Sequence, residues 1–160
     1  MISWTTDPSN GLLQYRNIDS ANAKGIEFEL DRHWLDKWDT SLSYSLQNTT
    51  DGRTGSILTD SPIHMVKFKL IAPLFNEWLF AGTEVLWMSS RKTLAGNEAS
   101  EHALVNLTLF SNKLYKDLEV SASLYNILDQ RYGDPGSVEH VEDQIEQDGR
   151  TFRVKLTYRF

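Results

Sequence analysis

The sequence predicts an all-β fold, built as an antiparallel meander of about eight strands. Two observations carry this prediction. Alternation of apolar and polar residues with a period of two recurs along the chain, and the connections between the alternating segments are short and long in turn. In Phe152–Phe160, every second residue is apolar or aromatic and the others are Arg, Lys or Thr. Thr, Ser, Val and aromatic residues fill the other periodic segments, which is typical of strands.

The strands are expected in eight segments: 11–18, 24–33, 38–48, 63–73, 77–89, 102–111, 117–127 and 149–160. Each has one apolar and one polar face, as where Ile26 and Phe28 alternate with Glu27 and Glu29. In the segment 77–89 the pattern is ambiguous. We place Glu84 on the polar face there, because a charge that faces lipid is costly.

The connections alternate in length. The short ones lie near 33–37, 73–77 and 111–116, and the long ones near 48–62, 89–102 and 129–148. This alternation is typical of a transmembrane outer-membrane β-barrel, whose periplasmic turns are short and whose extracellular loops are long. Most of the segments reach the roughly 9–11 residues that a tilted strand needs to cross a bilayer. The sequence therefore predicts part of such a barrel, or a reduced version of one.

Composition excludes several other classes. The chain has 160 residues, a formal net charge of -6 and no cysteine. A nucleic-acid partner is not expected, because phosphate binding needs a basic face. The chain has no run of 18 apolar residues, so a transmembrane helix is not expected either. The mean hydropathy of -0.42 does not argue against a barrel, because barrel strands alternate lipid-facing and lumen-facing residues.

Aromatic residues and leucines bracket the short connections with a weak period of 40 residues. The period relates Trp34, Leu74 and Leu114, and also Trp38, Trp78 and Leu118. One interpretation is an aromatic girdle at the membrane–water boundary, and the strand pattern favours it. The other is that these side chains hold the hairpin turns together.

Several motifs, in this order, resemble one known family. They are the hairpin over 17–27, Ser89–Arg91, Tyr125–Asp129, Tyr132–Pro135, Asp148–Phe152 and the closing Leu156–Phe160. Over roughly 11–160, the chain resembles the C-terminal third of the barrel of a TonB-dependent outer-membrane receptor. The family's barrel has about 22 strands and a plugged lumen. The resemblance implies that residues 1–160 are a C-terminal barrel segment, and that the plug domain and signal peptide lie outside this chain.

The resemblance implies a parent protein that imports a scarce nutrient, such as an iron–siderophore complex, across the outer membrane of a Gram-negative bacterium. Its partners would be the TonB complex through the plug, the barrel-assembly machinery, outer-membrane lipid and lipopolysaccharide. No cofactor is expected, and this segment alone is not expected to transport. The residues proposed to contact ligand, in loops or lumen, are Glu84, Arg91, Arg131, Tyr132 and Arg150. The residues proposed as the assembly signal are Leu156, Tyr158 and Phe160.

Simpler roles exist for most of these residues. Arg91 could bind ligand or lipopolysaccharide phosphate, or it could cap loop carbonyls. The charged residues of the polar faces could contact a plug or a ligand, or could form ion pairs across neighbouring strands. The connection 129–148 holds seven acids and one base, and we favour a solvated loop over a cation site. His140 lies near Glu139 and Glu142, but a metal site needs three or four converging ligands and none is expected.

Two other protein classes remain as alternatives. One is a stand-alone eight-stranded outer-membrane barrel with a structural role and no transport. The other is a soluble β-sandwich or lipocalin-like binder, against which the aromatic residues on the apolar faces and the terminal Phe160 argue. An enzyme is not expected, because no nucleophile-elbow, zinc-protease or phosphate-loop motif occurs in the sequence.

Overall fold

The structure is a computed structural model. It describes residues 2–17, 20–34, 37–75, 78–115 and 117–160. No helix in these ranges is long and apolar enough to cross a membrane. All regular secondary structure in the described ranges is β-strand, which confirms the all-β class.

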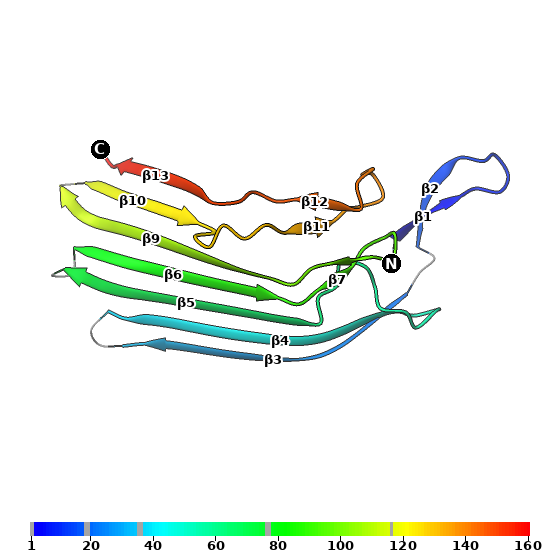
Figure 1. Cartoon of the computed structure of the whole chain (residues 1–160), viewed down its shortest axis with the longest axis horizontal. Coiled ribbons are helices and arrows are strands. Elements are labelled where there is room, and N and C mark those ends of the chain that lie inside the picture. The colour runs from blue at the N-terminus through cyan, green and yellow to red at the C-terminus, as the bar shows by residue number, and fades with distance from the viewer. Residues whose placement is uncertain (1, 18–19, 35–36, 76–77, 116) are drawn as a thin grey trace.

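The main sheet has seven antiparallel strands (Figure 1). They are β3 (Ala21–His33), β4 (Asp39–Asp51), β5 (His64–Phe75), β6 (Leu79–Met88), β9 (His102–Tyr115), β10 (Leu118–Tyr125) and β13 (Thr151–Tyr158). Their order is β13-β10-β9-β6-β5-β4-β3, so each strand pairs with the long strands that precede and follow it in the chain. This is the predicted meander. The sheet is open, with β3 and β13 at its two edges.

One predicted strand lies elsewhere. The segment 11–18 was expected to join the meander, but β2 (Leu13–Asn17) pairs only with β1 (Ile2–Thr6), in a separate two-stranded sheet. A tight turn sets this pairing, because the Gly11 amide donates to the Asp7 carbonyl at 2.8 Å and Gly11 has a φ of 71°. Alternation shows that a segment is a strand, but it does not show which strand is its partner.

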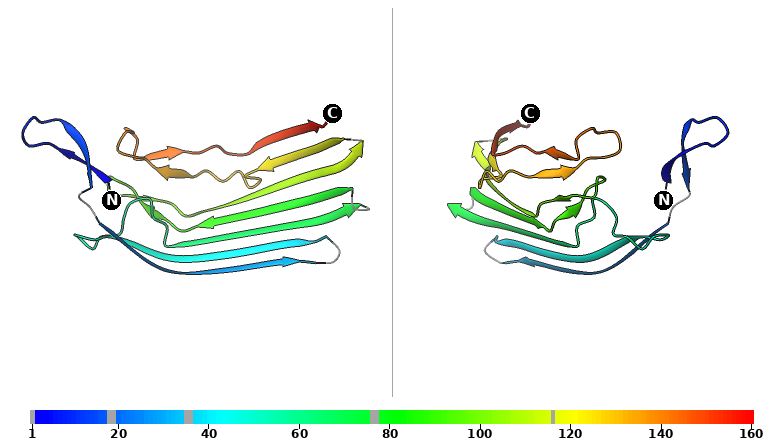
Figure 2. Two further views of the ribbon diagram at one scale, coloured as in Figure 1. Left: turned by 180° about the vertical axis from the view of Figure 1, so that it is seen from behind. Right: turned by 45° about the vertical axis from the view of Figure 1, so that its right-hand side comes forward.

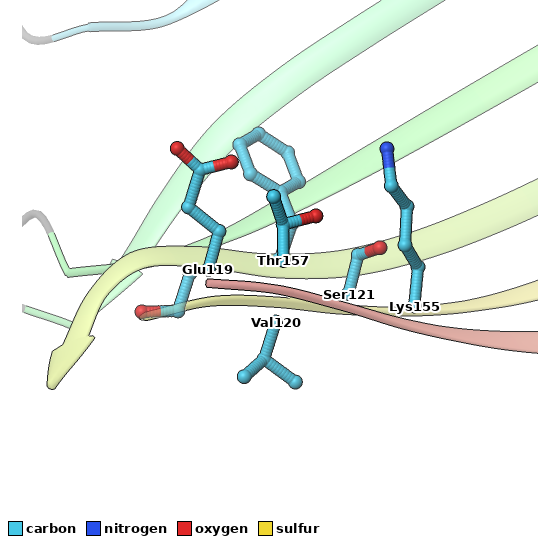
Figure 3. A pocket seen from close by; sticks show the side chains of 7 residues that line it. Glu119, Val120, Ser121, Lys155 and Thr157 are labelled. Carbon is cyan, nitrogen blue, oxygen red and sulfur yellow. The ribbon is translucent and has the colours of Figure 1, made fainter. Parts of the chain in front are cut away.

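The register places alternate residues of the seven strands on common faces. One row runs Phe28, Tyr44, Val66, Trp87, Ala103 across five strands, and the side that carries it is called the apolar face here. The next row runs Glu29, Ser43, Lys67, Leu86, Leu104, and it lies on the polar face. Figure 3 shows the same division at the β10–β13 edge, where Glu119, Ser121, Lys155 and Thr157 project to one side and Val120 to the other.

The apolar face is largely uncovered. Ile26 is 69% exposed, Phe28 52% and Phe152 82%, whereas the buried hydrophobic residues of the described chain are Phe80 and Ala99. Leaving apolar surface in water is unfavourable by roughly 25 cal/mol for each Å². A sheet without a core of its own therefore needs an apolar medium or other strands against this face.

The two ends of the sheet differ, as Figures 1 and 2 show. Short turns join the strands at one end. The long connections gather at the other end, together with the β1–β2 hairpin. The long connections contain two small hairpins, β7 (Arg91–Lys92) with β8 (Glu98–Ala99), and β11 (Gly133–Pro135) with β12 (Gln144–Glu146). We call these the short-turn end and the long-loop end.

Candidate functional site

The long-loop end is organised around Arg91, the first residue of β7. Its side chain is only 7% exposed, and its Nη1 donates to an Asp60 carboxylate oxygen at 2.9 Å. Its Nη2 donates to Asp134 at 2.5 Å. The three residues come from the β4–β5, β6–β9 and β10–β13 connections. One buried guanidinium therefore ties all three long connections together.

The backbone at the end of β6 directs Arg91 into this position. The Ser89 hydroxyl oxygen accepts hydrogen bonds from the backbone amides of Ile63 and His64, each at 3.1 Å. The Ser89 amide in turn donates to the His64 carbonyl at 3.0 Å. These bonds fasten the start of the β6–β9 connection to the start of β5, two residues before Arg91.

A second contact joins the β7–β8 hairpin to the β10–β13 connection through Asp143. One Asp143 carboxylate oxygen accepts from the Thr93 hydroxyl at 2.8 Å and from the Asn97 amide side chain at 3.0 Å. The other accepts from the Ala95 backbone amide at 3.2 Å. The Thr93 and Asn97 side chains lower the pKa of Asp143 below its ordinary value, with a further contribution from the Ala95 amide. The anionic form of Asp143 therefore holds the two connections together.

His102 and Tyr132 form a stacked pair beside Arg91. The ring centroids are 4.3 Å apart with an interplanar angle of 28°, and His102 is 3% exposed. Burial raises the pKa of the Tyr132 hydroxyl, and the nearby charges of Asp134 and Asp148 raise it further. Tyr132 therefore stays neutral at physiological pH and serves as an aromatic surface.

The two ends of the β10–β13 connection are joined at its base. At the start of the connection, the Asn126 amide side chain donates to the Gln130 carbonyl at 2.9 Å, and the Gln130 amide donates back to Asn126 at 3.0 Å. The same Asn126 side chain also donates to the Asp148 carbonyl, near the other end, at 3.5 Å. Asp129 accepts from the Arg150 backbone amide at 2.8 Å. A Cβ added at Gly149 would lie 2.8 Å from the Asp129 carboxylate, so only glycine fits there without a shift. Two motifs that lie about 20 residues apart in the sequence are thus in direct contact.

The structure brings together some of the proposed ligand residues. Arg91 and Tyr132 both belong to this assembly at the long-loop end. Arg131 and Arg150 lie in the same connection and are exposed, and neither has an ion pair among the described residues. Glu84 lies apart from them, in the middle of β6 on the polar face, where its register partners are Lys69 and Asn106.

The polar face around Glu84 forms an open hollow of about 520 Å³. Its polar lining residues are Glu29, Ser41, Ser43, Lys67, Lys69, Glu84 and Asn106. Although Lys69 and Glu84 are direct neighbours across two strands, no ion pair joins charged residues of this hollow in the described part of the chain. Cross-strand ion pairs, the alternative considered for the polar faces, are therefore not formed in this hollow, although Arg159 and Glu119 form one at the β10–β13 edge. The charges of the hollow remain available to other groups.

The residues proposed as an assembly signal lie on or just beyond the edge strand β13. Leu156 is 68% exposed, Tyr158 61% and Phe160 fully exposed, and Leu156 and Tyr158 are on the apolar face. Arg159 fixes the end of the strand, because its amide donates to the Asp117 carbonyl and its guanidinium pairs with Glu119, each at 2.9 Å.

The sequence did not indicate the partners of Arg91. Asp60 and Asp134 lie 31 and 43 residues from it, and no local spacing relates them. His102 and Asp143 were missed for the same reason. The one available signal for these partners was the charge of Arg91. It follows directly on a strand, and an arginine that is buried there requires anionic partners.

Comparison with known proteins identifies the chain's relatives. The family model described as TonB dependent receptor-like, beta-barrel, matches residues 1–127. The ferric-pyoverdine 358 receptor of Pseudomonas putida is 28% identical over 141 residues, which are 82% of this chain and 17% of that protein. This chain therefore spans less than a fifth of the length of that relative.

Solved structures agree in fold. The ferripyoverdine receptor FpvA of Pseudomonas aeruginosa, bound to a heterologous pyoverdine, superposes with a TM-score of 0.72 at 15% identity, over 99% of this chain and 23% of that one. The ferric enterobactin receptor PfeA of Pseudomonas aeruginosa gives 0.73 at 22% identity, over 94% and 24%. BauA, the ferric preacinetobactin receptor of Acinetobacter baumannii, gives 0.70 at 16%, over 98% and 25%.

These relatives are receptors and not enzymes, and such receptors are proteins of the outer membrane of Gram-negative bacteria. The sheet order, the uncovered apolar face and the long connections at one end are all features of such a barrel wall. The chain therefore belongs to the TonB-dependent receptor family, and it forms part of the outer-membrane β-barrel of that family.

Proposed function

We propose that this chain is the C-terminal part of the barrel of a ferric-siderophore receptor, and that the whole protein imports the iron complex with energy from the TonB complex acting on its plug. The observation that carries the proposal is the assembly at the long-loop end. Three connections, fixed around the buried Arg91, stand at the end of a polar sheet face. The relatives named for ferric-siderophore reception support the choice of ligand class.

Within this proposal, the arginines of the long-loop end have different roles. Arg91 is committed to Asp60 and Asp134, so it positions the connections. Arg131 and Arg150 are exposed and have no ion pair among the described residues, so their guanidiniums are available for anionic oxygens of the ligand. Tyr132 offers an aromatic surface close to them. Glu84 belongs to the wall below, which the ligand passes or the plug contacts.

The edges of the sheet favour a wide barrel over a small closed one. β3 and β13 each have an unpaired edge, and β3 is 13 residues long. Unpaired edges of this length aggregate unless other strands cover them. We infer that both edges pair with further strands of a wider barrel. The barrel-assembly machinery would recognise Leu156, Tyr158 and Phe160 at the end of β13.

The test is binding and uptake by the full-length receptor in a strain that lacks its own copy. A panel of radio-iron-loaded siderophores identifies the ligand, and binding is then compared between the native protein and the double variant Arg131→Gln, Arg150→Gln. Each lost charge-assisted hydrogen bond weakens binding by about 1.5 kcal/mol or more, so we expect at least a tenfold rise in Kd. Arg32→Gln, on the apolar face far from the loops, is the matched control.

If the receptor is present in the outer membrane in normal amounts and none of the iron–siderophore complexes is taken up, the proposed ligand class is overturned. An unchanged Kd for the double variant would overturn the roles of Arg131 and Arg150 only. For the small-barrel alternative, the 160-residue chain is refolded alone in detergent. Heat-modifiable migration of that chain as a closed monomer would overturn the inference of a wider barrel.

A further inference from the structure

The two internal methionines of the chain face each other across neighbouring strands. Met65, the second residue of β5, is the register partner of Met88, the last residue of β6. Met88 is in turn the partner of His102, the first residue of β9. Partners in register point to the same side of the sheet. Two thioethers and one imidazole therefore form a row on the polar face, just inside the long-loop end (Figure 1).

The three side chains of this row are close enough to share one small ligand. Direct partners across two strands have Cβ atoms about 4.5–5.5 Å apart, and Met88 is the direct partner of both other residues. A methionine side chain is unbranched and has three rotatable bonds, so its sulfur can be placed over a neighbouring residue. A single ion above Met88 can therefore contact Met65 from one side and His102 from the other.

Hydrogen bonds hold the two methionine-bearing strand ends in place. The Ser89 hydroxyl, next to Met88, accepts from the amides of Ile63 and His64, and His64 directly precedes Met65. The Ser89 amide donates back to the His64 carbonyl. Both methionine side chains are half-buried. Their backbones are thus fixed relative to each other, while their sulfur atoms remain reachable from the polar side of the sheet.

The His102 ring is held from the other side. It is 3% exposed, it stacks on Tyr132, and the amide of the following Ala103 donates to the Gln130 side chain at 3.1 Å. His102 Nδ1 faces the Ser100 carbonyl at 3.5 Å, and we assign the ring proton to this nitrogen. No other hydrogen bond or ion pair of the ring occurs among the described residues. Nε2 then carries the lone pair that a metal ligand needs.

This set of donors selects for one kind of metal ion. Thioether sulfur is a soft ligand that favours Cu(I), and imidazole also binds copper. Zinc sites instead use thiolate, imidazole and carboxylate ligands. All three donors of the row are neutral, and a half-buried site without anionic ligands takes a monovalent ion at lower cost than a divalent one. Glu27 lies in the same row only on β3, beyond Ser45.

We propose that Met65 Sδ, Met88 Sδ and His102 Nε2 form a binding site for Cu(I) on the inner wall of the barrel. The ion reaches the site from the polar side, where the two sulfur atoms are accessible. The proposed site uses none of the residues assigned to the iron complex, and it does not depend on which iron complex the receptor takes up. It is a second binding site, for a soft metal ion, below the Arg91 assembly.

The test measures Cu(I) binding by the full-length receptor in detergent, without oxygen and in competition with a coloured Cu(I) chelator. Each methionine is replaced by leucine, because exchange of these two residues conserves volume and is well tolerated in packed positions. Met88→Leu removes the central ligand. We expect it to weaken binding of one Cu(I) at least tenfold, since even changes to groups that only support a metal ligand typically cost about 10–100-fold in affinity. Met65→Leu is expected to act in the same direction.

His64→Gln is the matched control. It removes an imidazole from the residue next to Met65, but on the apolar face of the sheet, and Cu(I) affinity should be unchanged. Met88→His replaces the thioether by another copper ligand and should restore binding, which a purely structural role of Met88 would not explain. X-ray absorption by the bound copper should show sulfur neighbours in the native receptor, and these should be lost in the double variant Met65→Leu, Met88→Leu.

Equal Cu(I) affinity of the native receptor and Met88→Leu would overturn the proposal. So would an equal loss in His64→Gln, or binding of Zn(II) as tight as that of Cu(I). Heat-modifiable migration verifies folding, and Met65→Leu decides if Met88→Leu does not fold. Binding of the iron–siderophore complex is measured on the same samples and should be unchanged in Met88→Leu. A native receptor that binds Cu(I) but no iron–siderophore complex would count against the proposed function alone.

Discussion

The long-loop end and the short-turn end of the sheet are stabilised by different kinds of interaction. At the long-loop end, buried or half-buried polar groups are paired with partners far away in the sequence, as Arg91 is with Asp60 and Asp134. At the short-turn end, the turns are held by local contacts, and the bonds of Arg159 to Asp117 and Glu119 join the end of β13 to the start of the neighbouring β10. The Trp34 amide donates to the Trp38 carbonyl at 2.8 Å, and Lys37 and Asp117 take positive φ values of 63° and 58° in their turns.

This difference between the two ends is explained by how each end meets the solvent. The long-loop end works in water, where an ordered polar assembly requires that each buried charge finds a partner. At the short-turn end, Trp34, Trp38 and Trp78 are exposed, and no comparable network is found among the described residues. The comparison implies that substitutions at the long-loop end act over a distance, whereas those at the short-turn end act locally.

Removing the Arg91 side chain should have the largest effect. Arg91→Met leaves Asp60 and Asp134 without their common cation. Both carboxylates are partly exposed, so the free energy of unfolding is expected to fall by about 2–3 kcal/mol, less than when a fully buried pair is broken. Limited proteolysis of the folded receptor should then cleave all three long connections faster. Cleavage confined to the β6–β9 connection would contradict the idea that Arg91 ties the three together. Arg53→Met, in an exposed turn of the β4–β5 connection, is the control.

Acid should release a part of the same assembly. The pKa of Asp143 is lowered in the folded protein, so its contribution is complete above the ordinary value of 3.8 and is lost as the pH falls through the lowered pKa. Hydrogen exchange of the Ala95 amide should therefore accelerate at pH values below that range. In Asp143→Asn, exchange of the Ala95 amide should be fast already at neutral pH. Its rate should follow only the pH dependence that any unprotected amide shows. If exchange of the Ala95 amide in the native protein did not accelerate at acidic pH, the idea that ionised Asp143 holds the two connections together would be wrong.

The His102–Tyr132 stack should contribute a smaller amount. Tyr132→Phe keeps the aromatic surface and should change stability little, whereas Tyr132→Ala should cost about 1 kcal/mol beyond the loss of buried area. The midpoint of thermal unfolding measured by heat-modifiable migration separates the two variants. Equal unfolding midpoints for Tyr132→Phe and Tyr132→Ala would show that the stacking on His102 does not contribute to stability.

The smallest effect is expected at the short-turn end. Arg32→Gln removes the cation above Trp34, and an exposed cation–π contact is worth about 0.5–1 kcal/mol. Proteolysis of the long connections should be unchanged in this variant. Faster cleavage there would contradict the local character of this end and would remove the contrast between the two ends.

The strands could be predicted because their physical cause is local. The alternation of Ile26 and Phe28 with Glu27 and Glu29 fixes both the strand and its two faces, and the structure confirms them. The strand ends were less well predicted, since β4 continues to Asp51 through the polar residues Asn48, Thr49 and Thr50, where the alternation has ended. The girdle and turn-stapling interpretations both remain compatible with the stacked Phe75 and Trp78, and the side chain of Leu114 lies outside the described part.

The assembly of the long connections could not be predicted, because it depends on contacts between distant segments. Arg91 was singled out, but its proposed alternatives were a ligand, a lipid phosphate or loop carbonyls. The observed partners are two carboxylates from other connections. The pairing of β2 with β1 was missed for a similar reason, since partner choice depends on turn geometry around Gly11.

The closed base of the β10–β13 connection has a consequence for variation in this protein. The Asn126–Asp148 and Asp129–Arg150 hydrogen bonds bring the ends of the connection together, whatever lies between them. The entropic cost of closing a loop grows only with the logarithm of its length, by about 0.6 kcal/mol for each doubling. The exposed tip around Val138 and Val141 can therefore accept inserted peptides of considerable length while the strands below keep their register. The sequence and length of this connection can therefore vary while the strands of the barrel stay unchanged.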